Sequence, residues 1–284
     1  MSYAVLYRHF AGDPFFNMAV DEWLAWQASR QPRTIFLRLY TWAVGTITVG
    51  RHQDVRRALD WSRLGHTPVI RRVTGGRAVY HDPSELTYAI AVNLDHVDIP
   101  LLRGSLSRTA EGIATVLTAF LERLGRDAEY VRRSSPGESG RGVFHTLPCF
   151  ASVSRHEVVS GSRKVIASAQ RRFRSIFLQH GSIKLNGVAT HPALALPPWR
   201  RSCVPAGAFI SMSQFDSMAG IFGEVMAAFL GVTVERAEAA GLDESGMENF
   251  YRTVREHPLE ARDFFERDVT IASLSGECKR EKTA

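Results

Sequence analysis

One thiol and one amine stand out between Pro148 and Lys184. Cys149 follows a proline, and Lys164 comes fifteen residues later (164 − 149) in a run that alternates like a strand. The alternation places Lys164 and Ser168 on one face and small apolar residues on the other, so the polar face would look onto solvent or a pocket. A thiol becomes a catalytic nucleophile when a nearby cation stabilises its thiolate, and Lys164 is the candidate cation.

The sequence alone leaves other roles open for both side chains. A buried structural cysteine and an edge hairpin with a surface lysine are the ordinary alternatives. A hairpin turning at Gly161 would pair Lys164 with about Glu157 or Val158, and Cys149 would then lie roughly 20 Å along the strand. The two groups can meet only if the cysteine segment leaves the sheet and folds back. Three histidines could pair with the thiol instead: His145, His156 and His180.

A double glycine follows the strand-like run Val69–Val73. The turn Thr74–Gly76 leads into residues 77–81, and a further strand is expected over Leu86–Val92. A nucleotide P-loop or a Rossmann turn must open into a helix, so this turn is neither. Its glycines allow positive φ or a close approach of the backbone to a ligand, and a tight turn without a ligand is the alternative.

Length and composition predict a globular protein of one large domain or two unequal ones. The chain has 284 residues, 45% of them apolar and 23% charged. It shows no apolar run long enough to cross a bilayer and no secretory signal, so we expect no membrane association. Three widely spaced cysteines without a CxxC pair argue against a disulfide framework or a structural zinc site. They favour a reducing cytoplasm.

The net charge of +6 and the pI near 9.5 predict an acidic partner. That partner could be nucleic acid or an acidic carrier protein. The arginines come in short groups, without a long basic tail, a zinc-finger pattern or an RNP signature. We therefore favour a carrier protein and expect no nucleic acid.

The hydrophobic pattern predicts a chain of the α/β (α+β) class. Strands are expected at Tyr3–His9, Thr34–Tyr40, Val44–Val49, Val69–Val73 and Leu86–Val92, with the second and third forming a hairpin around Trp42. Helices are expected from Asp13 onward and at Asp54–Leu64, Ser105–Leu124, Ser211–Leu230 and Glu244–Glu256.

The pattern changes from β-rich to α-rich near Pro197–Pro205. We place a soft boundary there, between a domain over residues 1–200 and a small helical C-terminal part over residues 201–284 that packs on it. The polar, glycine-rich stretch Arg132–Gly142 precedes the thiol segment and is a candidate lid, with a surface loop as the alternative.

Three blocks of the sequence resemble the biotin/lipoate A/B protein ligase superfamily. RRVTGGRAVYHDPSELTYAIAV (Arg71–Val92) resembles the family's RRxTGGRAVxHxxELTYS block, and NMAVDEWL resembles its NMAxDE helix. GSRKVIASAQRRFRSIFLQHGSI resembles its GxKIxGSAQxR…QHGSI block. Together they cover most of residues 1–190 in the family's order. The GGR triplet and a PCF segment fifteen residues before the lysine are most similar to cysteine-dependent octanoyltransferases of the LipM type. Ala167 departs from the pattern, since a glycine is usual there.

The resemblance implies a lipoate/biotin ligase-like catalytic domain with a mixed β-sheet core, flanking helices and a tunnel for an acyl chain. It places the thioester-forming cysteine on Cys149 and the lysine that favours its thiolate on Lys164. It also implies a set of substrate-binding residues near the tunnel mouth: Arg71, Arg72, Gly75, Gly76, Arg77, Ala78, Tyr80, His81, Ser168 and Ala169.

The implied activity is that of an octanoyl-[acyl-carrier-protein]:protein N-octanoyltransferase in protein lipoylation. Octanoyl would pass from acyl carrier protein through acyl-Cys149 to a lysine of a lipoyl domain, on a glycine cleavage H protein or an E2 subunit. No cofactor or metal is expected, because thioester to amide runs downhill without ATP, and we expect a monomer. The alternatives are an ATP-dependent lipoate ligase, an amidotransferase between carrier proteins, and a non-catalytic protein that binds an acyl or nucleic-acid ligand. The donor, the chain length and the acceptor stay open.

Overall fold

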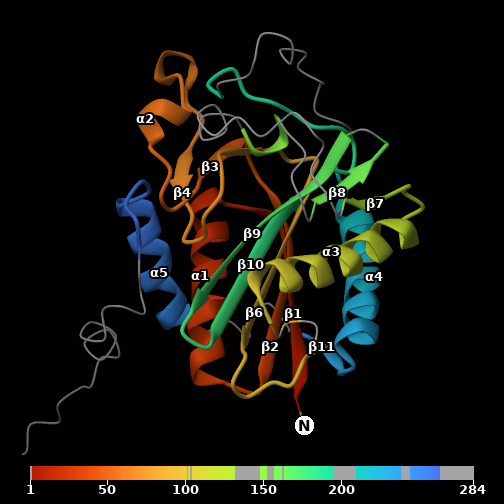
Figure 1. Ribbon diagram of the computed structural model, residues 1–284. Coiled ribbons are helices and arrows are strands. Elements are labelled where there is room, and N and C mark those ends of the chain that lie inside the picture. Colours follow the sequence, from red (N-terminus) through yellow and green to blue (C-terminus); the bar gives the residue numbers. More distant parts are fainter. Residues whose placement is uncertain are drawn as a thin grey trace, which may run out of the picture.

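The structure is a computed structural model that describes residues 2–100, 102, 104–131, 148–151, 157–161, 163–194, 209–237 and 244–262 (Figure 1). The candidate lid at residues 132–142 lies outside the described residues, as do Cys203 and Cys278. Within the described ranges, no helix combines the length and the apolar character needed to cross a membrane.

An eight-stranded mixed sheet forms the centre of the protein, in the order β11-β1-β2-β6-β10-β9-β8-β7. β1 runs parallel to both of its neighbours, and the other pairs are antiparallel. The mixed α/β fold is therefore confirmed. In chain order, the strands are β1 (Tyr3–Gly12), β2 (Thr34–Trp42), β6 (Leu86–Asn93), β7 (Glu129–Val131), β8 (Glu157–Ser160), β9 (Arg163–Phe173), β10 (Ile176–Ile183) and β11 (Val234–Arg236).

Helices cover both faces of this sheet (Figure 1). α3 (Leu106–Arg123) and α4 (Met212–Leu230) pack on one face, and α1 (Pro14–Arg30) and α5 (Glu244–Glu256) pack on the other. Successive residues of a central strand enter the two cores in turn: in β2, Leu37 belongs to the first core and Phe36 to the second. A strand buried on both faces carries apolar residues on both faces rather than on one, and β2 and β6 show this pattern, with Arg38 as the charged exception.

The helices begin at polar capping residues. Asp13 accepts hydrogen bonds from the backbone N–H groups of Phe15 and Phe16, and Pro14 occupies the first turn of α1. The Ser211 side chain and Gln214 form a reciprocal capping box at the start of α4. These caps satisfy N–H groups that have no partner inside the helix.

A second sheet of three strands, in the order β4-β3-β5, holds the glycine turn. It consists of β3 (Thr46–Val49), β4 (Val69–Arg71) and β5 (Val79–His81), with α2 (Val55–Ala58) and the short 3₁₀ turn η1 (Trp61–Arg63) between β3 and β4. The predicted hairpin between residues 34–40 and 44–49 is wrong. Both edges of β2 are occupied by β1 and β6, so β3 turns away and pairs with β4 and β5.

The single helix predicted over residues 54–64 is also wrong, because it divides into α2 and η1. Leu59 separates the two pieces in an extended conformation and bridges to Leu194. Burial of Leu59 against that segment therefore prevails over the local helical pattern.

The described part of the predicted C-terminal unit packs on the same sheet as the rest of the chain. Phe222 and Met226 of α4 belong to the first core, and Met247 and Val254 of α5 belong to the second. Arg262 forms an ion pair with Glu22 of α1 at 2.8 Å. The boundary near residue 200 stays a prediction.

Candidate active site

Cys149 and Lys164 meet in the structure. The Lys164 Nζ lies 3.3 Å from the Cys149 Sγ and 3.0 Å from the Cys149 carbonyl oxygen. Cys149 begins a 3₁₀ turn, η2 (Cys149–Ala151), outside the main sheet, and its N–H donates to the Ala78 carbonyl at 2.9 Å. Lys164 itself pairs with Val159 across β8 and β9. The segment that holds Cys149 thus folds back onto the Arg71–Val92 block, at Ala78. Such a fold-back was needed for the thiol to reach Lys164.

The Lys164 ammonium is almost completely buried, with 3% of the residue exposed. It donates to the Glu157 Oε1 at 2.5 Å and lies 5.3 Å from the centre of the Phe150 ring. Charged groups are rarely buried without partners, and here a carboxylate, a carbonyl, a thiol and an aromatic face surround one ammonium. Lys164 thus places a buried positive charge in direct contact with the Cys149 sulfur.

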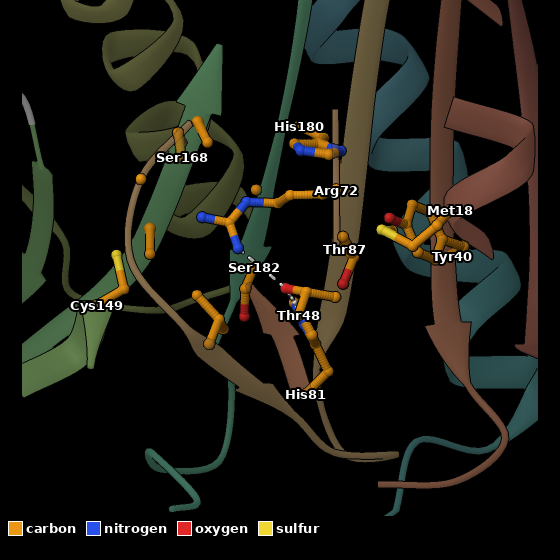
Figure 2. Close-up of a pocket in the computed structure, with 15 residues that line it drawn as sticks. Met18, Tyr40, Thr48, Arg72, His81, Thr87, Cys149, Ser168, His180 and Ser182 are labelled. Carbon is orange, nitrogen blue, oxygen red and sulfur yellow. Dashed lines mark hydrogen bonds between the residues drawn. The ribbon is translucent and has the colours of Figure 1, made fainter. Parts of the chain in front are cut away.

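A pocket opens beside the thiol, with Cys149 at one end and Met18 and Tyr40 toward the other in Figure 2. It holds about 410 Å³ of empty space, counted up to its open mouth. Arg72 reaches across the middle of the pocket in the same view.

Half of the ten residues predicted to bind substrate line this pocket: Arg72, Gly76, His81, Ser168 and Ala169. Nine further lining residues were not predicted. Several come from strands whose inward faces meet only in the folded sheet, and no local pattern distinguishes them: Met18, Tyr40, Thr48, Val79, Thr87, Ala167, His180, Gly181 and Ser182.

The other five predicted residues do not line the pocket. Four of them form hydrogen bonds with Cys149, Arg72 or Lys184. Arg77 donates to the Cys149 carbonyl at 3.3 Å. The carbonyls of Gly75, Ala78 and Tyr80 accept hydrogen bonds from the Arg72 guanidinium, the Cys149 N–H and the Lys184 ammonium. These groups position the lining residues and do not themselves face the pocket.

Arg71 departs furthest from its predicted place at the pocket mouth. Its guanidinium donates to four backbone carbonyls, those of Gly50, Arg51, Gln53 and Leu259. Arg71 ends β4 and Arg72 directly follows it; successive residues of an extended chain point to opposite sides, so Arg72 faces the pocket and Arg71 faces away from it. Arg71 therefore joins the loop after β3 to the segment that follows α5.

Arg72 places a second cation beside the pocket. Its guanidinium donates to the carbonyls of Gly75 and Arg77 at 2.7 and 2.9 Å and to the Thr48 hydroxyl at 3.3 Å. Burial lowers the pKa of Arg72 to about 10, although the charge of Cys149 opposes that change. Arg72 therefore stays charged at neutral pH, on the pocket wall that Cys149 shares.

A chain of buried polar groups continues from Thr48 through His81. The His81 Nε2 lies 2.8 Å from the Thr48 Oγ1, and its Nδ1 lies 2.6 Å from the Glu85 Oε1. The other oxygen of Glu85 accepts from the buried Lys184 ammonium, which is also 3.2 Å from the Asp82 Oδ2. Burial alone would raise the pKa of Glu85, but Lys184 and His81 hold it at about 2.

His81 is a neutral group in this chain. Burial lowers its pKa, and the attraction of Glu85 only partly opposes this. With the Nδ1 hydrogen directed at a carboxylate, the Nε2 accepts from the Thr48 hydroxyl. The polar part of the pocket wall is thus fixed by hydrogen bonds that run back to Lys184.

His180, one of the three histidines considered as a partner for the thiol, lines the same pocket but is held elsewhere. Its Nε2 lies 2.6 Å from the Thr74 Oγ1, and its Nδ1 lies 2.8 Å from the Asp21 Oδ2. Asp21 also accepts from Arg38 at 2.8 Å. Burial would raise the pKa of Asp21, yet His180 and Arg38 lower it. His145 and His156 lie outside the described residues, so among these histidines the structure tests only His180.

No group of three or more His, Cys, Asp or Glu side chains in the described ranges could hold a metal ion. Beside the pocket, the described residues bring together a thiol, an ammonium and a carboxylate. These are the groups that nucleophilic catalysis by cysteine requires.

Comparison with known proteins places this arrangement in a family. The family model for the lipoyl protein ligase A/B catalytic domain matches residues 13–206. The octanoyltransferase LipM of Moorella thermoacetica is 35% identical over 189 residues, which are 65% of this chain and 67% of that protein. The octanoyltransferase LipM of Kyrpidia tusciae is 37% identical over 177 residues, 62% of this chain and 63% of that one. The matches thus span about two thirds of the length of these relatives.

The fold has solved counterparts as well. A bipartite lipoate protein ligase from Thermoplasma acidophilum superposes with a TM-score of 0.59 at 17% identity, over 90% of this chain and 92% of that one. At this identity the likeness concerns the fold alone. The match over residues 13–206 includes the α1 helix, the glycine turn, Cys149 and Lys164. The chain belongs to the lipoyl protein ligase A/B catalytic domain family.

Proposed function

We propose that this protein is an octanoyltransferase that carries an acyl group on Cys149. The observation that supports this proposal most is the 3.3 Å contact between the Lys164 Nζ and the Cys149 Sγ beside a pocket. Two relatives named octanoyltransferase LipM, at 35% and 37% identity, point to the same activity. The donor is octanoyl-acyl carrier protein, and the acceptor is a lysine of a lipoyl domain.

In the first step the Cys149 thiolate attacks the carbonyl carbon of the donor thioester. A new bond forms between that carbon and Sγ, the bond to the donor sulfur breaks, and the carrier thiol leaves with the proton that Cys149 gave up. Lys164, which donates toward Sγ, stabilises the attacking thiolate. Thioester is exchanged for thioester, so the step is close to balanced.

In the second step the neutral amine of the acceptor lysine attacks the acyl-Cys149 carbonyl. A carbon–nitrogen bond forms, the carbon–sulfur bond breaks, and Cys149 leaves as a thiolate that takes up the proton lost by the amine. An amide replaces a thioester, so the step runs downhill and needs no ATP. The tetrahedral oxyanion of each step requires donors, and Lys164 is the nearest candidate.

Intact-protein mass spectrometry tests this proposal. The protein is incubated with octanoyl-carrier protein, and we expect one octanoyl adduct that Cys149→Ala removes. Adding a lipoyl domain should discharge the adduct and move its mass to the acceptor. A wild type without an adduct, or a Cys149→Ala variant that still modifies the acceptor, contradicts the proposal.

The same experiment separates the alternatives of this fold. An ATP-dependent lipoate ligase would modify the acceptor from free lipoate and ATP, with or without Cys149. An amidotransferase would form the adduct from an octanoylated lipoyl domain and not from octanoyl-carrier protein. Supplying the donors side by side therefore identifies the class of donor.

A further inference from the structure

Glu157 lies directly against the catalytic amine, although no part of the proposed reaction yet uses it. Its Oε1 is 2.5 Å from the Lys164 Nζ, and the two side chains are 14% and 1% exposed. Glu157 begins β8, the strand that pairs with β9, which carries Lys164. The contact thus joins neighbouring strands on the side where Cys149 lies.

The charges around Lys164 change during the reaction. In the free enzyme the ammonium has two possible counter-charges, the Cys149 thiolate and the Glu157 carboxylate. Acylation converts the thiolate into a neutral thioester and removes the first of them. Glu157 then remains as the anion in direct contact with a buried ammonium. A buried charge without a partner is unfavourable, so this carboxylate becomes the group that stabilises the ammonium in its place.

We propose that Glu157 is a positioning residue that balances the charge of the Lys164 ammonium and keeps it directed at Cys149 in the acyl-enzyme, so that it acts chiefly on the second half of the reaction. This inference rests on the proposed acyl-Cys149 intermediate. When the acceptor amine displaces the sulfur, Cys149 must leave as a thiolate. The Lys164 ammonium, when it is held 3.3 Å from the sulfur, stabilises that leaving group.

The first half of the reaction depends less on the carboxylate. There the Cys149 thiolate itself is a counter-charge for Lys164, and a second negative charge nearby opposes its formation. Replacing Glu157 with glutamine therefore removes a repulsion as well as an attraction in the free enzyme. In the acyl-enzyme it removes only the attraction. The two steps should respond differently to one substitution.

The experiment measures both steps separately in a protein with one thiol, made by Cys203→Ser and Cys278→Ser. Acylation by octanoyl-carrier protein and discharge to a lipoyl domain are each followed as single turnovers by intact mass. For Glu157→Gln we expect acylation close to wild type and discharge slower by at least about tenfold. The acyl-enzyme should accumulate during steady turnover. Glu157→Asp, which keeps the charge, should recover part of the discharge rate.

Discharge to hydroxylamine shows whether the defect lies in the chemistry or in docking of the acceptor. This small nucleophile needs no docking surface, so a defect in chemistry appears with it as well. Glu129→Gln is the matched control, because Glu129 lies on the neighbouring strand β7 with an exposed side chain. It should leave both rates unchanged.

Each other outcome overturns the inference in a recognisable way. Equal slowing of both steps by Glu157→Gln would mean that the residue only supports the local structure. Unchanged discharge would mean that Lys164 needs no carboxylate in the acyl-enzyme. If the wild type forms no adduct at all, the proposed function fails and this inference fails with it.

Discussion

The ammonium of Lys164 lies between a sulfur and a carboxylate, and its burial makes it sensitive to both. Replacing it with methionine keeps the approximate volume and removes the charge. In the single-thiol background, we expect Lys164→Met to lower the rate of Cys149 alkylation by iodoacetamide at neutral pH by about tenfold or more. The rate is measured by intact mass. An unchanged rate would show that another group activates the thiol.

His9 predicts a pH dependence of stability away from the pocket. Its Nδ1 accepts a hydrogen bond from the Arg38 Nε at 3.0 Å. Burial, aided by the charge of Arg38, lowers the pKa of His9 from 6.5 to about 3. His9 therefore binds a proton near pH 6.5 in the unfolded chain, but only near pH 3 in the folded protein. The contribution of His9 to stability is complete above pH 6.5 and is lost as the pH falls through this window.

The expected size follows from the two pKa values. At about pH 5, the proton bound only by the unfolded state lowers the free energy of unfolding by about 2 kcal/mol relative to neutral pH. His9→Gln removes the titrating group. Between neutral pH and about pH 5, the variant should therefore lose about 2 kcal/mol less of its free energy of unfolding than the wild type loses. Urea unfolding of both proteins at the two pH values measures the difference. Parallel losses would contradict the assignment.

At the scale of elements, the glycine turn between β4 and β5 shows how backbone geometry positions a side chain. Gly76 has a φ of +93°, and a Cβ built on it would lie 2.8 Å from a guanidinium nitrogen of Arg72. Gly75 has ordinary backbone geometry and open space around a Cβ. The backbone conformation and the nearby Arg72 thus require a glycine at position 76, whereas neither requires one at position 75.

This difference predicts that an alanine at position 76 destabilises the protein and that an alanine at position 75 does not. Gly76→Ala should lower the free energy of unfolding by about 1–3 kcal/mol, because alanine is strained at positive φ and displaces Arg72. It should also reduce formation of the acyl adduct. Gly75→Ala should stay within about 0.5 kcal/mol of wild type and form the adduct normally. Urea unfolding and intact mass measure the two effects, and equal behaviour of the two variants would contradict the argument.

The thiol segment is the element in which sequence patterns and tertiary contacts diverge most. The alternation in β9 was expected to give one polar face and one apolar face. In the structure, Ile166 belongs to the first core, although the alternation predicted it on the same face as Lys164. A bulge between Val158 and Val159 also shifts the pairing of β8 with β9 by one residue. Such a shift depends on the partner strand, which a single-strand pattern does not contain.

For the whole molecule, the net charge of +6 predicts how the donor is found. An acidic carrier protein is attracted over distances comparable to the Debye length, which shrinks from about 10 Å at 0.1 M salt to about 3 Å at 1 M. We expect kcat/KM for octanoyl-carrier protein to fall by roughly tenfold over this range. An uncharged octanoyl thioester of N-acetylcysteamine is the control. Equal salt responses of the two donors would show that charge plays no part in docking.

The two C-terminal helices complete the hydrophobic cores on the two faces of the main sheet. α4 completes the core under α3, and α5 lies against α1. The segment after α5 contacts the end of β4, because the Arg71 N–H donates to the Pro258 carbonyl and the Arg71 guanidinium donates to the Leu259 carbonyl. Residues of the predicted C-terminal part therefore contact Arg71, which directly precedes the pocket-lining Arg72.

By itself, the sequence determined the fold class, most strands and helices, the family, and the two residues that the structure joins at the thiol. Local patterns, caps and motif spacing carry that information, because they depend on neighbours along the chain. Only the tertiary structure decided which of Arg71 and Arg72 faces the pocket, that His180 is held by Asp21, and that Lys164 pairs with Val159 rather than with Glu157 or Val158. These outcomes depend on which strands pair and on which buried charges must find partners, and both are settled only when distant segments pack together.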